Sequence, residues 1–177
     1  MPDLNIPVDE KFTINFKHNG GKFLYCDSIN EVFSNLDNII IENKWQDQTF
    51  FSMDKRLEEK FSKQEINFTN LPNKSEIFFT TCEHLIAQNG SILVCSNQLK
   101  ERKLHELPSN VIVFATTSQM VESISEGLKT IKKKYKNVIP ANITTIKHFQ
   151  PTAENSDDFL TYGSSSKNLY LLLLEDL

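Results

Sequence analysis

Two near-continuous apolar segments constrain the fold most strongly. Residues 111–116 read VIVFAT, and residues 169–174 read LYLLLL. Apolar runs of this length are typical of strands that are covered on both faces, as in a parallel sheet flanked by helices. Neither run is long enough to cross a membrane. We therefore expect both segments to be buried strands.

Strands and helices alternate through the first third of the chain. Lys22–Cys26 is predicted to be a strand, and Asp27 or Ser28 is predicted to cap a helix that runs to about Asn38. Residues 10–19 fit either a helix or one arm of a hairpin that turns at Asn19-Gly20. Further strands are expected at 49–53, 66–69, 76–81 and 143–149, and further helices at 55–64 and 118–136. This order predicts an α/β fold: a single layered domain with a mostly parallel sheet and one β-hairpin.

Length and composition indicate one ordinary globular domain. The chain has 177 residues, of which 39% are hydrophobic and 24% charged, as is usual for a soluble protein with a substantial core. We predict a lead-in at 1–9 and one domain at 10–177. The formal net charge of -4 gives no overall attraction to nucleic acid or anionic lipid, so neither is an expected partner. The basic run at 132–136 fits the end of a helix, or a patch for a partner or an anion.

The cysteine pattern bears on the compartment. The three cysteines are an odd number without a CxxC pair, and no apolar segment near the N-terminus resembles a signal peptide. Free thiols in a reducing cytoplasm are the prediction.

The stretch CEHLIAQNGSILVCS at 82–96 has three interpretations. Cys82, His84 and Cys95 could supply three zinc ligands, or a cysteine nucleophile with a histidine base. The apolar runs on both sides of Asn89-Gly90 favour a β-hairpin instead. Within a hairpin strand, Glu83 points to the face opposite His84, so one of the two faces the buried or cleft side. A polar side chain there needs hydrogen bonds or a function.

Four segments stand in a distinctive order. They are the hairpin TCEHLIAQNGSI at 81–92, the connection ERKLHELP at 101–108, the strand VIVF at 111–114, and Gly163 ahead of the buried strand at 168–174. In this order they resemble the LUD-domain family, the lactate-utilisation proteins of LutC type, which have a similar hairpin and an R-x-L-S-x-L-P connection. The resemblance extends from about residue 20 to residue 174.

The resemblance implies both a fold and a role. The fold is the α/β fold of ribose-phosphate isomerase, glucosamine-phosphate deaminase, CoA transferases and formyltetrahydrofolate cyclo-ligase, with a helix at 10–19. The role is an accessory component of lactate utilisation and oxidation that works with iron–sulfur partner proteins. The chain has no cysteine cluster that could ligate an iron–sulfur centre, and we predict no cofactor of its own.

Two family motifs are replaced in this sequence. The family's G-P-S-R-T-A-D-I-E corresponds to FQPTAENSDD at 149–158, and its G-V-H-G-P corresponds to GSSSK at 163–167. Glu154, Asp157 and Asp158 would repel a phosphate or carboxylate near the helix start expected there. The GSSSK loop offers N–H, hydroxyl and ammonium donors, or it is a plain surface turn.

The candidate site follows from these segments. Glu83 is the candidate catalytic group, by analogy with the glutamate nucleophile of related CoA transferases. Arg102 fits an anion contact or a structural tie, and no metal site is predicted. Two alternatives to the accessory role stay open: an isomerase- or cyclo-ligase-type enzyme for a phosphorylated, CoA- or folate-type ligand, and a binding or regulatory module that has lost the site. The candidate ligand-binding residues are Asn89, Gly90, Ser91, Arg102, Gly163, Ser164 and Lys167.

Overall fold

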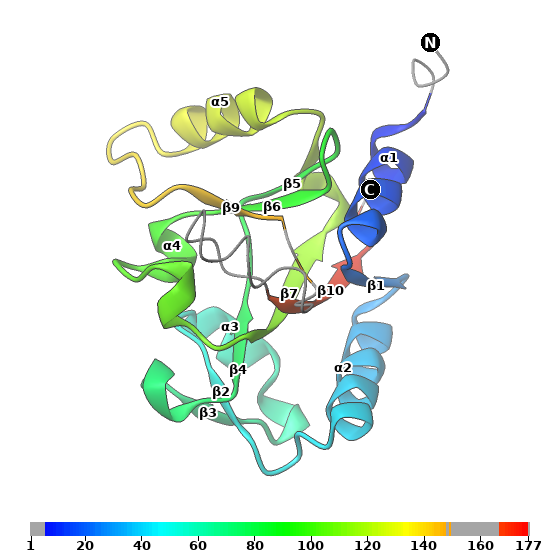
Figure 1. Ribbon diagram of the computed structural model, residues 1–177, viewed down its shortest axis with the longest axis vertical. Helices are drawn as coiled ribbons and strands as arrows, with labels where there is room; N and C mark the ends of the chain where they lie inside the picture. Colours follow the sequence, from blue (N-terminus) through cyan, green and yellow to red (C-terminus); the bar gives the residue numbers. More distant parts are fainter. Residues whose placement is uncertain (1–5, 148, 150–166, 177) are drawn as a thin grey trace, which may run out of the picture.

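The computed structural model describes residues 6–147, 149 and 167–176, which form two β-sheets with helices packed around them (Figure 1). The strands are β1 (Lys22–Cys26), β2 (Thr49–Phe51), β3 (Asn67–Thr69), β4 (Ile77–Thr80), β5 (His84–Ile86), β6 (Ser91–Val94), β7 (Asn110–Thr116), β8 (Met120–Val121), β9 (Thr144–Ile146) and β10 (Asn168–Leu174). Sheet A has the order β1-β10-β7-β4-β2-β3, and its neighbouring strands are all parallel. Sheet B has the order β8-β5-β6-β9 and contains the antiparallel pair of β5 and β6. The predicted α/β fold with a mostly parallel sheet is confirmed, and sheet B adds a second layer.

The two apolar segments form the centre of sheet A. β7 and β10 pair in parallel from Asn168 opposite Asn110 to Leu174 opposite Thr116. The inner residues of both strands are buried, and only the end residues are partly exposed. Cover on both faces explains why neither segment alternates with polar residues. Both predictions of a buried strand are confirmed.

One face of sheet A is covered by α2 (Ile29–Asn43) and the short α3 (Lys55–Lys60) (Figure 1). The hydroxyl of Ser28 caps α2 by accepting a hydrogen bond from the Glu31 N–H at 3.3 Å. The helix continues past the predicted end at Asn38 and stops where Lys44 adopts a φ of 60°. This extension buries Ile39 and places the ring of Trp45 edge-on to that of Tyr170, with 6.2 Å between centroids.

The other face of sheet A is covered by α1 (Val8–His18) and sheet B. Phe12 and Phe16 of α1 stack at 5.3 Å between centroids, and Phe16 also contacts Phe149 at 4.8 Å. These rings pack in one core cluster with Leu169 and Leu171 of β10. Residues 10–19 therefore form a helix, as the resemblance implies, and not a hairpin arm. The helix begins at Val8, so it includes the last two residues of the predicted lead-in.

The chain passes from sheet A to sheet B at the residues that precede the hairpin. β4 ends at Thr80, and β5 begins at His84 after a short irregular link. The polar residues at this point therefore mark a change of sheet, not an interruption within one strand. The predicted hairpin is present, since β5 and β6 pair from His84 opposite Leu93 to Ile86 opposite Ser91. Its loop spans residues 87–90 and is closed by the Gly90 N–H, which donates to the Ile86 carbonyl at 2.8 Å.

The helix predicted at 118–136 is wrong in its first part. Residues Thr117–Gln119 form a 3-10 turn, β8 follows, and α5 (Ile124–Lys134) begins only after Ser123, whose hydroxyl caps it. The Gln119 amide donates to the Cys82 carbonyl at 2.7 Å, and β8 pairs in parallel with β5. These tertiary contacts are stronger than the local helical pattern and hold Met120 in a strand.

The remaining elements are short. They are α4 (Ser96–Leu99) and the 3-10 turns η2 (Ser62–Gln64), η3 (Pro72–Lys74), η4 (Leu104–Glu106) and η5 (Thr117–Gln119). Across the part of the chain that the structure describes, no helix is both long and apolar enough to cross a bilayer.

Candidate functional site

An open hollow of about 990 Å³ lies beside α4 and the connection that follows it. Lys100, Arg102 and Lys103 supply three cations to its wall, and Glu101 and Glu106 supply two carboxylates. Within residues 6–147, 149 and 167–176, the guanidinium of Arg102 has no hydrogen-bond or ion-pair partner. An unpaired guanidinium at the wall of a hollow is suited to a carboxylate or phosphate ligand.

The wall of this hollow is held in an uncommon conformation. Lys100 adopts φ 55° and ψ -123°, a region that residues other than glycine rarely occupy and that costs about 1–3 kcal/mol. The side-chain amide of Asn142 donates to the Lys100 carbonyl at 3.2 Å and to the Arg102 carbonyl at 2.8 Å. Asn142 thereby fixes the backbone on which Arg102 is carried.

Lys167 binds the connection at 101–108, which also carries Arg102. Its ammonium donates to the carbonyls of Leu104, Leu107 and Pro108 at 2.6, 3.1 and 3.2 Å, and the residue is only 2% exposed. Burial lowers the pKa of Lys167 to about 8. All three hydrogens of the ammonium are used within the protein, so the structure places Lys167 as a support for the Arg102 connection.

Glu83 lies behind the hollow and is almost fully buried. Its carboxylate accepts hydrogen bonds from the amide of Gln98 at 2.7 Å, the amide of Asn97 at 3.3 Å and the hydroxyl of Tyr135 at 3.1 Å. Burial alone would raise the pKa of Glu83, but these three donors and the charge of Lys134 lower it overall. Burial and the Glu83 carboxylate raise the pKa of Tyr135 to about 12. Glu83 is therefore an ionised acceptor, and it positions Asn97, which lines the hollow.

The thiols and the histidine of the stretch at 82–96 have structural contacts. Cys82 and Cys95 are buried, and burial raises the pKa of both thiols, that of Cys95 to about 11. Neither is a thiolate near neutral pH, which a cysteine nucleophile requires. The Nδ1 atom of His84 lies 3.0 Å from the Gln119 carbonyl. Among the described residues, no three histidine, cysteine or acidic side chains are grouped closely enough to hold a metal ion.

The hairpin loop makes its contacts with α1. The Asn89 side chain accepts hydrogen bonds from the backbone and the hydroxyl of Ser91, and the Asn89 carbonyl accepts one from the Asn19 amide at 2.7 Å. Gly90 has a φ of 71°, and a Cβ atom there would lie 2.4 Å from the backbone carbon of Asn15. The structure therefore brings Asn89, Gly90 and Ser91 to α1, away from the wall that carries Arg102.

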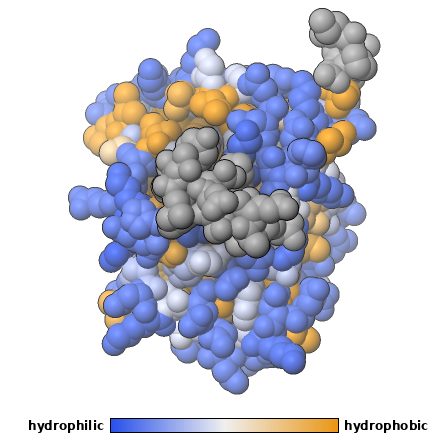
Figure 2. Space-filling model, viewed as in Figure 1, coloured by the Kyte–Doolittle hydropathy of each residue, from blue (hydrophilic) through white to orange (hydrophobic). Residues whose placement is uncertain are grey.

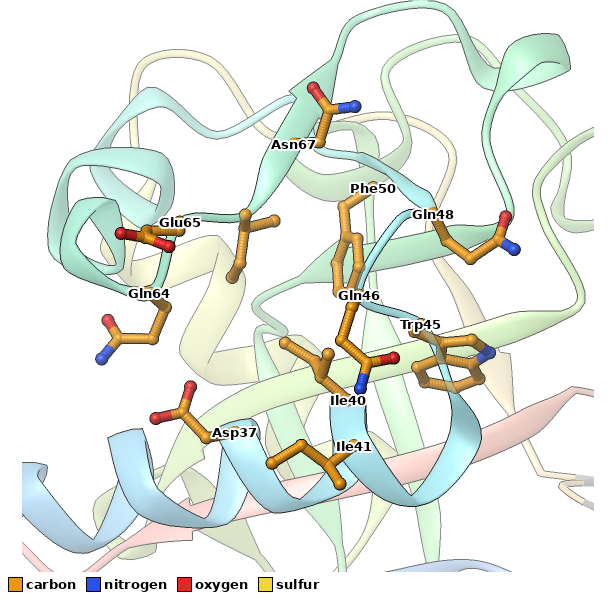
Figure 3. Close-up of a pocket in the computed structure, with 11 residues that line it drawn as sticks. Asp37, Ile40, Ile41, Trp45, Gln46, Gln48, Phe50, Gln64, Glu65 and Asn67 are labelled. Atoms are coloured by element: carbon orange, nitrogen blue, oxygen red, sulfur yellow. The ribbon is translucent and has the colours of Figure 1, made fainter.

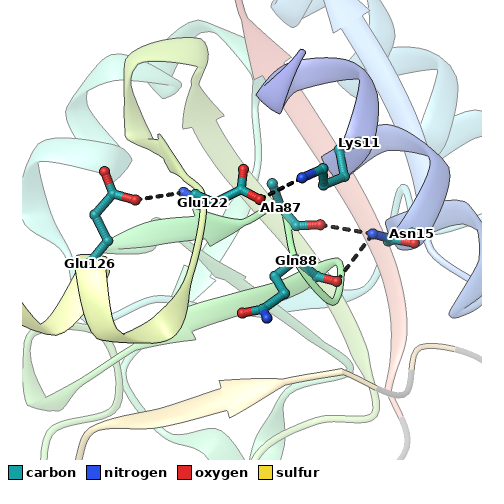
Figure 4. A network of polar contacts seen from close by, with 6 residues as sticks. All are labelled: Lys11, Asn15, Ala87, Gln88, Glu122 and Glu126. Carbon is teal, nitrogen blue, oxygen red and sulfur yellow. Dashed lines mark hydrogen bonds and ion pairs between the residues drawn. The ribbon is translucent and has the colours of Figure 1, made fainter. Parts of the chain in front are cut away.

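Figure 4 shows how the same loop is attached to α1 by side chains. The Asn15 amide donates to the carbonyls of Ala87 and Gln88 at 2.8 and 3.3 Å, and Lys11 forms an ion pair with Glu122. Gly163 and Ser164, the other candidate ligand-binding residues, lie outside the described residues, as do Glu154, Asp157 and Asp158.

A polar cluster at the carboxyl ends of β7 and β10 was not among the predicted site residues. Asp176 accepts hydrogen bonds from the Ser118 hydroxyl at 2.6 Å, the Ser118 N–H at 2.8 Å and the Thr117 hydroxyl at 2.9 Å. The Ser118 hydroxyl is the main cause that lowers the pKa of Asp176 to about 2. The sequence carries a signal for this cluster, because polar residues directly follow two apolar strands that are adjacent in the sheet. Ligands of open α/β sheets commonly bind at this edge, but a carboxylate there opposes an anionic ligand.

Comparisons with known proteins agree with this architecture. Residues 10–174 match the LUD domain family. Among solved structures, a DUF162 family protein from Deinococcus radiodurans is similar over 96% of both chains, with a TM-score of 0.61 and 10% sequence identity. Ribose 5-phosphate isomerase from Plasmodium falciparum is similar over 66% of this chain and 54% of that chain, with a TM-score of 0.31 and 19% identity. No curated protein matches the sequence.

The fold, in which a parallel sheet and a hairpin-containing sheet enclose a phenylalanine-rich core, is that of a two-sheet α/β protein, and the DUF162 structure shares it. Because the family match spans nearly the whole chain, this protein belongs to the LUD-domain family.

Proposed function

We propose that this chain is a LutC-like accessory component of lactate utilisation, which acts in the cytoplasm beside iron–sulfur partner proteins. The observation that carries this proposal is the LUD-domain match over residues 10–174. The cysteine content supports an accessory role. An iron–sulfur cluster commonly takes four cysteine ligands, and this chain has three, each of them buried. Electron transfer would then belong to the partners.

A surface segment supports contact with such partners. Val138, Ile139 and Ile143 lie between α5 and β9 and are 79%, 51% and 39% exposed. Figure 2 shows hydrophobic residues gathered at the upper left of the visible face, over this connection. Lys132, Lys133 and Lys134 in the last turn of α5 add positive charge beside it. Exposed apolar groups close together, with a charged rim, are typical of protein–protein contacts.

The experiment is purification of a tagged chain from its host, grown on lactate and on glucose. The expected result is enrichment of iron–sulfur proteins from lactate-grown cells, recognised by mass spectrometry and by their visible absorption. The variant V138D/I139D should lose this enrichment. Leu71→Asp is the matched control. Leu71 is also an exposed apolar residue, at 47%, but it is not part of the segment that holds Val138 and Ile139. The proposal would be contradicted if no iron–sulfur protein co-purified under either condition and a deletion strain grew unchanged on lactate.

A second candidate function is the binding of a small anionic molecule at the Arg102 hollow. The unpaired guanidinium beside Lys100 and Lys103 favours it. Lactate, phosphate, a sugar phosphate, CoA and a folate are suitable probes in a thermal-shift screen followed by calorimetry. We expect Arg102→Gln to abolish any shift that a probe causes. Arg56→Gln should keep the shift, because Arg56 is exposed on α3 and outside the hollow. Equal loss in both variants, or no shift with any probe, would contradict this function.

A further inference from the structure

A second hollow, of about 310 Å³, lies at the amino-terminal ends of β2 and β3. Figure 3 shows Ile40 and Phe50 at its centre, Gln64 and Glu65 on one side and Trp45 on the other. Its volume corresponds to about ten water molecules, which is enough for a ligand of about ten non-hydrogen atoms. The hollow is separate from the Arg102 site, because the two share no lining residue.

The charge at this hollow is negative. Asp37 and Glu65 line it, and its described lining includes no lysine, arginine or histidine. Lys44 and Lys63 are next in sequence to Trp45 and Gln64, but neither lines the hollow. Neither lining carboxylate has an ion-pair or hydrogen-bond partner among the residues that the structure describes. An organic cation would find two unpaired carboxylates here, and an anion would be repelled.

Four amide side chains line the hollow. In the described parts of the chain, Gln46, Gln48, Gln64 and Asn67 make no side-chain hydrogen bond, although all four line the hollow. The Gln64 Oε1 atom is buried and has no hydrogen-bond partner among the residues that the structure describes, so one acceptor there is unsatisfied. The carbonyl oxygens around the hollow are therefore available to a hydrogen-bond donor.

We propose that this hollow binds a small organic cation, an ammonium group carried on an apolar body. The ammonium would donate to the lining amide oxygens beside Asp37 and Glu65, and the body would pack on Ile40, Ile66 and Phe50. This chemistry uses both the apolar floor and the unpaired acceptors. It is independent of the lactate-related role, because it concerns a different surface and the opposite charge.

Trp45 gives a direct readout of binding. It is the single tryptophan of the chain and it lines the hollow, so its fluorescence reports on the surroundings of this hollow. Three probes of closely similar size separate the contributions: phenethylamine, which is protonated at pH 7, the neutral 2-phenylethanol, and the anionic 3-phenylpropionate. Each is titrated into the full chain at millimolar concentrations. We expect a saturable change in fluorescence with phenethylamine. The Kd for the alcohol should be about tenfold higher, and the carboxylate should cause no change.

Charge-neutralising variants test the same point. Asp37→Asn and Glu65→Gln should each raise the Kd for phenethylamine about three- to fivefold, in line with the modest strength of exposed ion pairs. Asp47→Asn is the matched control, since Asp47 lies between two lining residues and is exposed but does not line the hollow. It should leave the Kd unchanged. Equal binding of all three probes, equal effects of the three variants, or no saturable change with phenethylamine would overturn the proposal.

Discussion

Sheet A and sheet B are held in place by different kinds of interaction. In sheet A, the central strands β7 and β10 bury apolar side chains on both faces, and the helices on one side and sheet B on the other cover them. Sheet B also buries apolar residues, and individual polar contacts join it and its flanking residues to neighbouring elements. They include Asn15 to the hairpin loop, Gln119 to Cys82, and Glu83 to α4.

This difference predicts different responses to mutation. Hydrophobic burial is non-directional and is spread over many atoms, so a packed sheet tolerates changes that preserve volume. A hydrogen-bonded contact depends on one donor and one acceptor at a fixed distance. Small changes at sheet B should therefore cost more, and act more locally, than equally small changes in the helices that cover sheet A.

The largest effect is expected for Gly90→Ala. The positive φ of 71° costs about 1–3 kcal/mol for a residue with a Cβ atom. The new atom would also lie 2.4 Å from the Asn15 backbone, and such overpacking costs about 1–3 kcal/mol more. We expect a loss of about 2–6 kcal/mol in the free energy of unfolding, measured by urea titration.

Gly127→Ala is the matched control for this prediction. It places the same methyl group on α5, where the nearest atom is a side-chain carbon of Leu93 at 3.1 Å and φ is not positive. The gain of about 1 kcal/mol in helix propensity offsets the contact. A Gly90→Ala variant as stable as Gly127→Ala would show that α1 does not fix the hairpin loop.

The second prediction concerns Lys167. Its pKa of about 8 in the folded protein is below the value of about 10.4 in an unfolded chain. The folded state therefore binds fewer protons between these values, and the Lys167 contribution to stability is lost as pH falls through 8. The stability advantage of the wild type over Lys167→Met should increase by about 3 kcal/mol between pH 7 and pH 10.5.

Unfolding titrations across this pH range test the Lys167 prediction. The control is Lys103→Met, which removes an exposed lysine from the same connection and should give a difference that does not depend on pH. A constant or shrinking difference for Lys167→Met would mean that burial does not lower the pKa of Lys167 in the folded protein.

The third prediction is a loss of about 1–3 kcal/mol for Glu83→Gln at pH 7. The new side chain has one acceptor oxygen where the carboxylate had two, so its NH2 group replaces the acceptor of either the Gln98 amide or the Tyr135 hydroxyl. The folded pKa of Glu83 is lowered, so its contribution is present above the unfolded value of about 4.3. It is lost as pH falls through the folded pKa. The difference between wild type and variant should therefore shrink between pH 6 and pH 3. Glu101→Gln, an exposed change of the same kind, should show no such trend.

The two sheets also differ in how far the sequence predicts them. The inner strands of sheet A follow from local composition, since 111–116 and 169–174 are apolar throughout. β8 does not follow, because Met120 and Val121 continue the helical spacing of Ile124 and Ile131. What ends the helix is a contact from Gln119 to Cys82, 37 positions away. No local pattern encodes a contact at that separation.

The candidate site shows the same division. Arg102 is identified by the R-x-L connection, and the structure places it at a hollow. Lys167 follows a Gly/Ser stretch that suggests a ligand loop, yet its ammonium binds carbonyls about 60 positions earlier in the chain. Burial of a lysine depends on which distant backbone groups surround it, and a single sequence does not specify those groups.

The smallest predicted effect compares the two regions most directly. Asn15→Ala removes two hydrogen bonds to the hairpin loop but gains helix propensity, for a net loss of about 0.5–1.5 kcal/mol. Asn38→Ala makes the same change on an exposed position of α2, where it should stabilise the protein by a few tenths of a kcal/mol. Hydrogen exchange should then rise at residues 87–90 in the Asn15 variant and stay unchanged in β7 and β10. If both variants are equally stable and exchange alike, the polar contacts contribute nothing to the placement of sheet B, and apolar burial alone accounts for both sheets.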